Sequence, residues 1–89
     1  MAEHPDPAGH LVQLLIRPNC HLCQPAREAM ARVAEVAGVR WEEIDVTGDP
    51  KLEREYGDRL PVVLLDGKEH GYWRVEEDRL LRDLGSQPR

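Results

Sequence analysis

An aliphatic segment runs directly into a pair of cysteines in HLVQLLIRPNCHLC, residues 10–23. Gln13 is the single polar side chain among the aliphatic residues that end at Ile16, and Arg17-Pro18-Asn19 follows. A short apolar run that stops at turn-forming residues is typical of a buried strand. The sequence therefore predicts a strand over 10–16 and a turn over 17–19, with Cys20 and Cys23 directly after the turn.

The cysteines open an amphipathic segment. Small and apolar side chains recur every three or four residues after Cys20, at Ala26, Ala29, Met30, Val33, Ala34 and Ala37. Gly38 follows them and is a typical residue at which a helix ends. We therefore expect a helix that begins at Cys20 and ends at Ala37. Pro25 lacks the N–H that would bond to the carbonyl of His21, so we expect an irregular or kinked first turn.

The rest of the chain predicts three strands and two short helices. β-forming side chains and an Asp-Gly hairpin turn indicate the strands, over 39–46, 62–65 and 68–73. Two short helices are indicated over 50–56 and 76–84, because each is followed directly by a glycine and the first has a proline in its first turn.

The resulting order is β-α-β-α-β-β-α. Two crossover units followed by a hairpin and a covering helix predict an α/β fold with a four-stranded mixed sheet flanked by three helices, which is the thioredoxin-like arrangement. A chain of 89 residues has room for a single hydrophobic core, so we expect one domain over 1–89. Residues 1–9 and 86–89 are expected to be flexible tails.

Composition excludes several classes of function. The apolar fraction of 40% falls in short blocks, none near the roughly 20 residues of a membrane span. The first ten residues have neither a basic start nor an apolar core, so they do not predict a secretion signal. A formal charge of −5 opposes binding to phosphate backbones. We therefore expect a cytoplasmic monomer that binds neither membranes nor nucleic acid.

The Cys20-His21-Leu22-Cys23 motif predicts thiol-disulfide chemistry. Unpaired N–H groups and the helix dipole favour a thiolate at a helix start, so Cys20 is the expected nucleophile. Cys23, one turn on, can attack the mixed disulfide formed by Cys20 and release the substrate. A protonated His21 would stabilise the thiolate further, but it is equally well a solvent-facing residue. Leu22 is expected to offer substrate an apolar contact.

Other interpretations of the cysteine pair remain open. The same spacing supplies half of a tetrahedral zinc site. His4, His10, His21 and His70 are scattered, however, and no second ligand pair is visible, so we predict redox chemistry and no metal. An iron-sulfur cluster shared between two subunits through Cys20, and a redox-silent interaction protein that keeps the fold, are the alternatives.

Several motifs together resemble the glutaredoxin-like branch of the thioredoxin superfamily, specifically the small bacterial glutaredoxin-like proteins with His-Leu between the cysteines. These motifs are Asn19-Cys20-His21-Leu22-Cys23, Ile44-Asp45-Val46 with Asp49-Pro50, Tyr56-Gly57, Arg59-Leu60-Pro61-Val62-Val63 and Asp66-Gly67.

The resemblance implies a site around the dithiol. Leu60-Pro61 would be a cis peptide beside the cysteines, with the Leu60 backbone free to pair with substrate. Arg17 and Arg59 would bind glutathione, which would act as co-substrate, with no bound cofactor. The implied substrates are protein disulfides or glutathionylated thiols, and the implied reductant is glutathione or a thioredoxin-reductase-type system. Residues 70–74 depart from the family, with one glycine where two are usual, which favours a protein partner.

Three further side chains are candidates for packing or for the site. Trp41 is expected to pack in the core, whereas Trp73 is open between packing and a substrate groove. The acidic clusters over 42–45 and 76–78 are expected to be solvated faces and helix-dipole complements. Asp45 would be an exception if it lay buried beneath the dithiol, where an acid assists proton transfer in some thioredoxin relatives.

Overall fold

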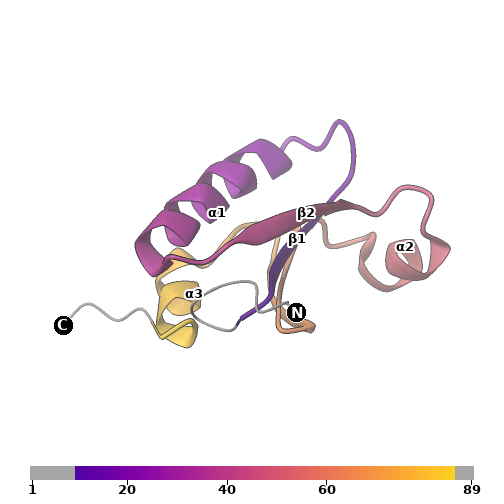
Figure 1. Ribbon diagram of the computed structural model, residues 1–89. Helices are drawn as coiled ribbons and strands as arrows, with labels where there is room; N and C mark the ends of the chain where they lie inside the picture. Colours follow the sequence, from indigo (N-terminus) through magenta and orange to yellow (C-terminus); the bar gives the residue numbers. More distant parts are fainter. Residues whose placement is uncertain (1–9, 86–89) are drawn as a thin grey trace.

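The computed structural model describes residues 10–85, so the predicted tails at 1–9 and 86–89 lie outside the described residues. Seven elements follow one another in the predicted order. They are β1 (Val12–Ile16), α1 (Cys23–Ala37), β2 (Trp41–Asp45), α2 (Pro50–Tyr56), β3 (Val62–Leu65), β4 (Lys68–Tyr72) and α3 (Glu77–Asp83), drawn in Figure 1. Each of the predicted elements is present: α2 and β3 have the predicted bounds, and the ends of the other elements differ from the prediction by at most three residues.

The four strands form one mixed sheet with the order β2-β1-β3-β4. β1 and β2 are parallel, as a strand-helix-strand crossover requires, with Val12 opposite Trp41. β3 runs antiparallel to both β1 and β4, and the two-residue turn at Asp66-Gly67 joins the hairpin. The predicted thioredoxin-like class, a four-stranded mixed sheet flanked by three helices, is confirmed.

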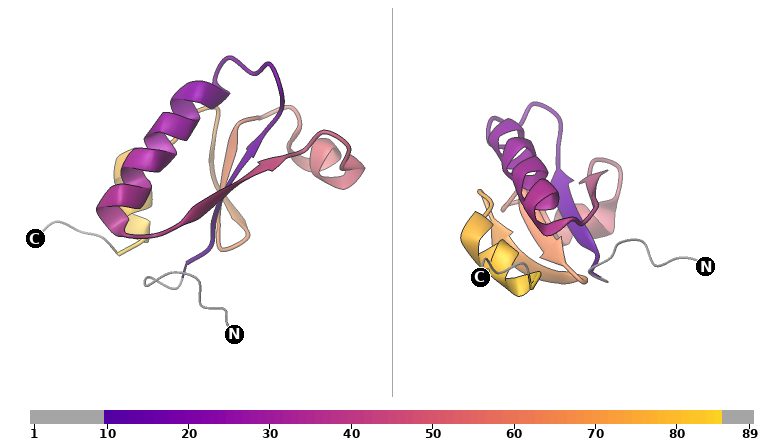
Figure 2. Two further views of the ribbon diagram at one scale, coloured as in Figure 1. Left: turned by 45° about the horizontal axis from the view of Figure 1, so that its top comes forward. Right: turned by 60° about the vertical axis from the view of Figure 1, so that its left-hand side comes forward.

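The helices cover both faces of the sheet. α1 and α3 lie together on one face, and α2 lies on the other (Figures 1 and 2). The larger core cluster lies under α1 and α3 and includes Leu14, Met30 and Leu80, all at most 1% exposed. A smaller cluster on the α2 face is built around Leu15 and Val62. Strands buried on both faces explain the nearly continuous aliphatic runs of β1 and β3.

Helix α1 begins later than predicted. Cys20 to Cys23 form a turn, closed by a 3.2 Å hydrogen bond from the Cys23 N–H to the Cys20 carbonyl, and the helix begins at Cys23. Its first helical bond runs from Ala26 N–H to the Leu22 carbonyl at 3.2 Å. The prediction that the helix begins at Cys20 was therefore wrong, because apolar periodicity cannot distinguish a preceding turn from a first helical turn.

Pro25 does not interrupt α1. It is the third residue of a helix that runs without a break from Cys23 to Ala37. The first N–H groups of a helix have no intrahelical partner, so a proline there removes no hydrogen bond. The expected kink followed from the wrong start of the helix.

Side-chain placement agrees with the packing prediction for Trp41, which is half-buried against the larger core cluster. Among residues 10–85, no helix has the length and apolar character needed to cross a membrane.

Candidate active site

Three loop segments meet at one end of the sheet. Leu15 pairs with Val62 in antiparallel β1 and β3, so the residues that follow β1 lie beside those that precede β3. Val62 also pairs with Tyr72, which brings the residues after β4 to the same end. The Cys20–Cys23 turn, the Leu60–Pro61 peptide and the segment from Trp73 onward are therefore gathered there by the strand register.

The two cysteines are free thiols that differ in exposure. Cys23 is only 1% exposed and belongs to the larger core cluster, whereas Cys20 is partly exposed and packs on the edge of that cluster. The two thiols influence each other's ionisation, and the Cys23 thiol donates to the Arg17 carbonyl at 4.0 Å. Cys20 is thus the thiol that a partner can reach, and Cys23 lies behind it.

Burial raises the pKa of Cys23 to about 11, and the neighbouring Cys20 thiol contributes in the same direction. An apolar environment disfavours the charged thiolate, so the thiol keeps its proton at neutral pH. A backbone hydrogen bond of Arg17 and the positive charge of Arg27 lower this pKa, but by less. At neutral pH Cys23 is therefore a thiol and not a thiolate.

Arg27 is a charged neighbour of the dithiol that the sequence analysis did not identify. Its charge interacts with both Cys20 and Cys23, and it lies four residues after Cys23 on α1, which is one turn of the helix. Glu43 on β2 holds the guanidinium through a 2.8 Å hydrogen bond from Nε, and Nη2 forms an ion pair with the same carboxylate oxygen at 2.8 Å. The spacing of four residues from the second cysteine was the available signal.

The Leu60–Pro61 peptide bond is cis. Pro61 is buried, and its carbonyl accepts a 2.8 Å hydrogen bond from the Trp73 N–H. Within residues 10–85, no hydrogen bond joins the Leu60 N–H or carbonyl to another backbone group. The Leu60 side chain packs against the smaller core cluster on the α2 face. The Leu60 backbone consequently has its hydrogen-bonding groups free at the end of the sheet that carries the cysteines.

The two arginines assigned from the resemblance are in different states. The Arg17 side chain is exposed and, within residues 10–85, makes one hydrogen bond, 3.3 Å from Nη2 to the Gly57 carbonyl. Arg59 is heavily engaged, because its Nε and Nη2 donate to the two oxygens of Glu69 at 3.2 Å each, and Nη2 also donates to the Glu55 carbonyl at 3.0 Å. Its guanidinium lies over the Tyr56 ring, 5.8 Å from the centroid. Among the described residues, the Arg17 guanidinium therefore has more unpaired donors than that of Arg59.

The two residues between the cysteines both face solvent. His21 is exposed, and Leu22 is 47% exposed even though it is a large apolar side chain. Trp73, left open by the sequence, is 53% exposed and makes an edge-on contact with Tyr72, with ring centroids 5.0 Å apart. Leu22 and Trp73 line one groove at this end of the molecule.

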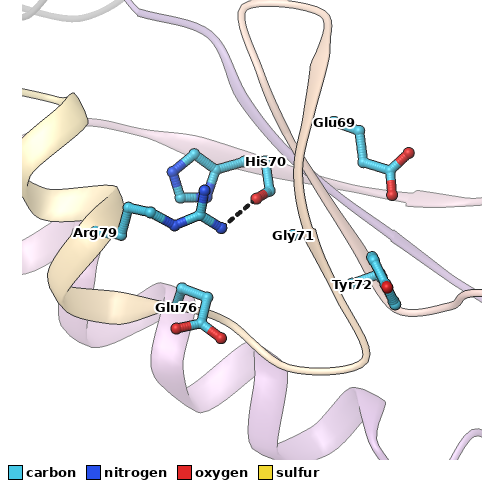
Figure 3. Close-up of a pocket in the computed structure, with 6 residues that line it drawn as sticks. All are labelled: Glu69, His70, Gly71, Tyr72, Glu76 and Arg79. Carbon is cyan, nitrogen blue, oxygen red and sulfur yellow. Dashed lines mark hydrogen bonds between the residues drawn. The ribbon is translucent and has the colours of Figure 1, made fainter.

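A second cavity, of about 500 Å³, lies along β4 (Figure 3). The pairing of β3 with β4 has a bulge between Val63 and Leu64. Figure 3 shows that the side chains of Glu69 and His70 point to opposite sides of β4. Arg79 donates to the His70 carbonyl, and His70 Nε2 lies 2.8 Å from Asp83, so both contacts fix α3 against β4. No thiol lines this cavity; its polar groups position α3.

Asp45 does not lie beneath the dithiol. Its side chain is exposed and accepts a 2.9 Å hydrogen bond from the Thr47 N–H, which makes it a turn residue. The suggestion of a buried acid was wrong because a strand end gives no indication of which way its last side chain points. Across the part of the chain that the structure describes, no group of three or more His, Cys, Asp and Glu side chains is arranged to hold a metal ion.

The fold and the paired thiols define a protein of the thioredoxin superfamily. Residues 11–85 match the family model of the glutaredoxin-like domain (DUF836), and the chain belongs to this family.

Two curated relatives illustrate the match. An uncharacterised protein of Mycobacterium tuberculosis is 47% identical over 78 residues, which cover 82% of this chain and 80% of the relative. A glutaredoxin-like protein of Dictyostelium discoideum is 32% identical over 82% of this chain and 73% of its own length.

Solved structures agree. The structural genomics target XcR50 from X. campestris, 32% identical, superimposes with a TM-score of 0.68 over 86% of this chain and 99% of its own. Yeast mitochondrial thioredoxin 3, at 19% identity, has a TM-score of 0.61 over 88% of this chain and 78% of its own, and shares the fold.

Proposed function

We propose that this protein is a thiol-disulfide oxidoreductase that reduces protein disulfides or glutathionylated thiols through Cys20 and Cys23. One observation carries the proposal: two free thiols, one partly exposed and one buried, occupy the sheet end that also carries the cis Leu60–Pro61 peptide. Membership of the glutaredoxin-like family and the thioredoxin-like fold support redox chemistry at such a pair.

The reaction has two steps. The Cys20 thiolate attacks one sulfur of the substrate disulfide, the S–S bond breaks, and the leaving thiolate takes up a proton. Cys23 then loses its proton and attacks the Cys20 sulfur, which breaks the mixed disulfide and releases the second substrate thiol. Two electrons pass from the protein to the substrate, and a Cys20–Cys23 disulfide remains. Two thiol equivalents, from glutathione or a thioredoxin-reductase-type system, restore the dithiol and are themselves oxidised to a disulfide.

The difference in burial supports this division of roles. Cys20 is the reachable nucleophile, while Cys23, 1% exposed, does not compete for substrate. Because the raised pKa keeps Cys23 protonated, the mixed disulfide on Cys20 persists until Cys23 gives up its proton. The free backbone groups of Leu60 can pair with an extended substrate segment, as an added strand pairs with a sheet edge. Arg17 and the exposed side chains of His21 and Leu22 complete the contact surface.

We also propose that the protein acts in the cytoplasm, because a dithiol that acts as a reductant has to be regenerated and the cytoplasm is reducing. We propose that it acts as a monomer, because a monomer leaves the dithiol face open to a substrate protein.

The test is capture of the intermediate. A Cys23→Ser variant keeps the reachable thiol and cannot complete the second step, so incubation with a disulfide should yield one stable adduct on Cys20, identified by peptide mass. The matched control is Cys20→Ser, in which the remaining thiol is buried and should form little adduct. Equal labelling of the two variants, or no adduct on Cys20, would argue against the proposal.

A further inference from the structure

A groove of about 310 Å³ lies between the cysteine turn and the segment after β4. Its walls are mostly apolar and come from both elements, namely Leu22, Pro25, Ala26 and Ala29 on one side and Trp73 and Val75 on the other. Leu22 and Trp73, two of the few large hydrophobic side chains that are strongly exposed in the described residues, face this same space. Apolar surface of this kind beside a site of chemistry indicates a contact for a partner.

The groove borders the turn that carries the thiols. Leu22 belongs to the turn between Cys20 and Cys23, and Cys20 and Val75 pack against the same core cluster. Trp73 is fixed by its N–H bond to the Pro61 carbonyl. A residue next to a cysteine that is being attacked by Cys20 would therefore come within reach of this groove.

The charges at the rim are already paired. Arg32 donates to both oxygens of Glu77, at 3.2 and 2.8 Å, and Arg74 Nε lies 3.8 Å from Glu76. Three carboxylates, of Glu76, Glu77 and Asp78, begin the nearby helix α3. A ligand with free carboxylates, such as glutathione, would have to compete with Glu77 for Arg32 and with Glu76 for Arg74, whereas an uncharged apolar side chain enters the groove without displacing either contact.

We propose that this groove is a substrate subsite, and that it takes a large apolar side chain flanking the target cysteine of a protein substrate. The inference rests on the proposed thiol-disulfide function and adds the class of substrate. Leu22 and Trp73 form its two exposed walls, and burial of an aromatic or leucine side chain between them supplies the preference.

The test uses short peptides whose single cysteine carries a 2-nitro-5-thiobenzoate mixed disulfide, because release of the coloured thiol reports attack by reduced protein. The residue next to the cysteine is phenylalanine, serine or glutamate, on either side. We expect the second-order rate constant for the phenylalanine peptide to exceed that for the serine peptide about tenfold, equivalent to about 1.4 kcal/mol. The glutamate peptide should react no faster than the serine peptide.

Variants locate the preference. In Leu22→Ser and in Trp73→Asn, the ratio of the phenylalanine to the serine rate constant should fall to about one. Asparagine suits position 73 because Trp73 has φ +70°, a conformation that asparagine tolerates. The matched control is Leu11→Ser, since Leu11 is 46% exposed, as Leu22 is 47% exposed, but precedes β1 at the opposite end of the strand. This control should keep the ratio of the unaltered protein.

The outcomes separate the two proposals. Reaction with all peptides at equal rates, or a preference that survives both groove variants, would overturn the subsite and leave the thiol chemistry standing. Absence of reaction with any peptide and with a small disulfide that has no flanking residues would overturn both.

Discussion

Arg59 donates to both carboxylate oxygens of Glu69, at 3.2 Å from Nε and 3.2 Å from Nη2. Family resemblance assigns this arginine to glutathione, yet the Glu69 contact raises its pKa and occupies the face of the guanidinium that would grip a carboxylate. A substrate anion would have to displace a bidentate partner from the same molecule. Glu69 thereby reduces the electrostatic attraction available to glutathione.

Replacement of Glu69 by glutamine should release Arg59. In Glu69→Gln we expect the rate constant with glutathione disulfide to rise about threefold to tenfold relative to that with an uncharged disulfide, because a charge-assisted contact becomes available. Stopped-flow measurements on both substrates would give the ratio. Glu42→Gln is the matched control. Glu42 lies on β2, at the opposite edge of the sheet from Glu69, and accepts a hydrogen bond from Gln13. An unchanged ratio in Glu69→Gln would mean that Arg59 plays no part in anion binding.

Arg27→Gln should slow the second step of the reaction. Arg27 lowers the pKa of Cys23 through its positive charge, so its loss raises that pKa further and leaves less thiolate at neutral pH. We expect resolution of the mixed disulfide to slow by about twofold to fivefold at low salt, and the difference to shrink in 1 M salt, where the Debye length is about 3 Å. Rapid-quench mass analysis of the mixed disulfide would give the rate.

Arg32→Gln is the control for this effect. Arg32 is also a cation on α1 in a salt bridge with a glutamate, Glu77 in place of Glu43, but neither thiol is among its electrostatic partners. Equal slowing in both variants would assign the effect to general loss of surface charge.

Much of this molecule could be predicted from its sequence. The aliphatic runs of β1 and β3 and the periodicity of α1 are strong local signals, and they fixed the order of elements and the class of sheet. The turn from Cys20 to Cys23 could not be predicted as such, because its residues continue the helical pattern. Side-chain partners across the fold, such as Glu69 for Arg59 or Glu43 for Arg27, depend on strand register and on the bulge in β4, which local patterns do not encode.

Alkaline pH should weaken the fold through Cys23. In the unfolded chain this thiol ionises near its ordinary pKa of 9.0, whereas in the folded protein the pKa is raised to about 11. Between these values the unfolded state has lost the proton that the folded state keeps, so the free energy of unfolding falls as pH rises from about 9 to about 11. Below pH 9 this contribution is fully present.

The measurement is urea unfolding under reducing conditions at a series of pH values. Cys23→Ser titrates no thiol at this position, so the difference in unfolding free energy between the unaltered protein and this variant isolates the contribution of Cys23. The difference should be constant up to pH 8 and then move against the unaltered protein. Parallel curves across the alkaline range would contradict a buried, protonated Cys23.

Leu80 connects α3 to the rest of the molecule, and its loss should be costly. The side chain is fully buried, with 0% exposure, in the core cluster that also contains Cys23 and Met30. Leu80→Ala removes one methine and two methyl groups from a fully buried site, so we expect a loss of about 2–5 kcal/mol in unfolding free energy. Leu81→Ala, at a half-buried neighbour on the same helix, should cost clearly less unfolding free energy.

Because α3 anchors the segment that carries Trp73 and Val75, partial release of α3 should also reduce the peptide preference proposed for the groove. Equal unfolding free energies for the two variants, measured in urea, would mean that α3 contributes little through Leu80 and that the groove is held by other contacts.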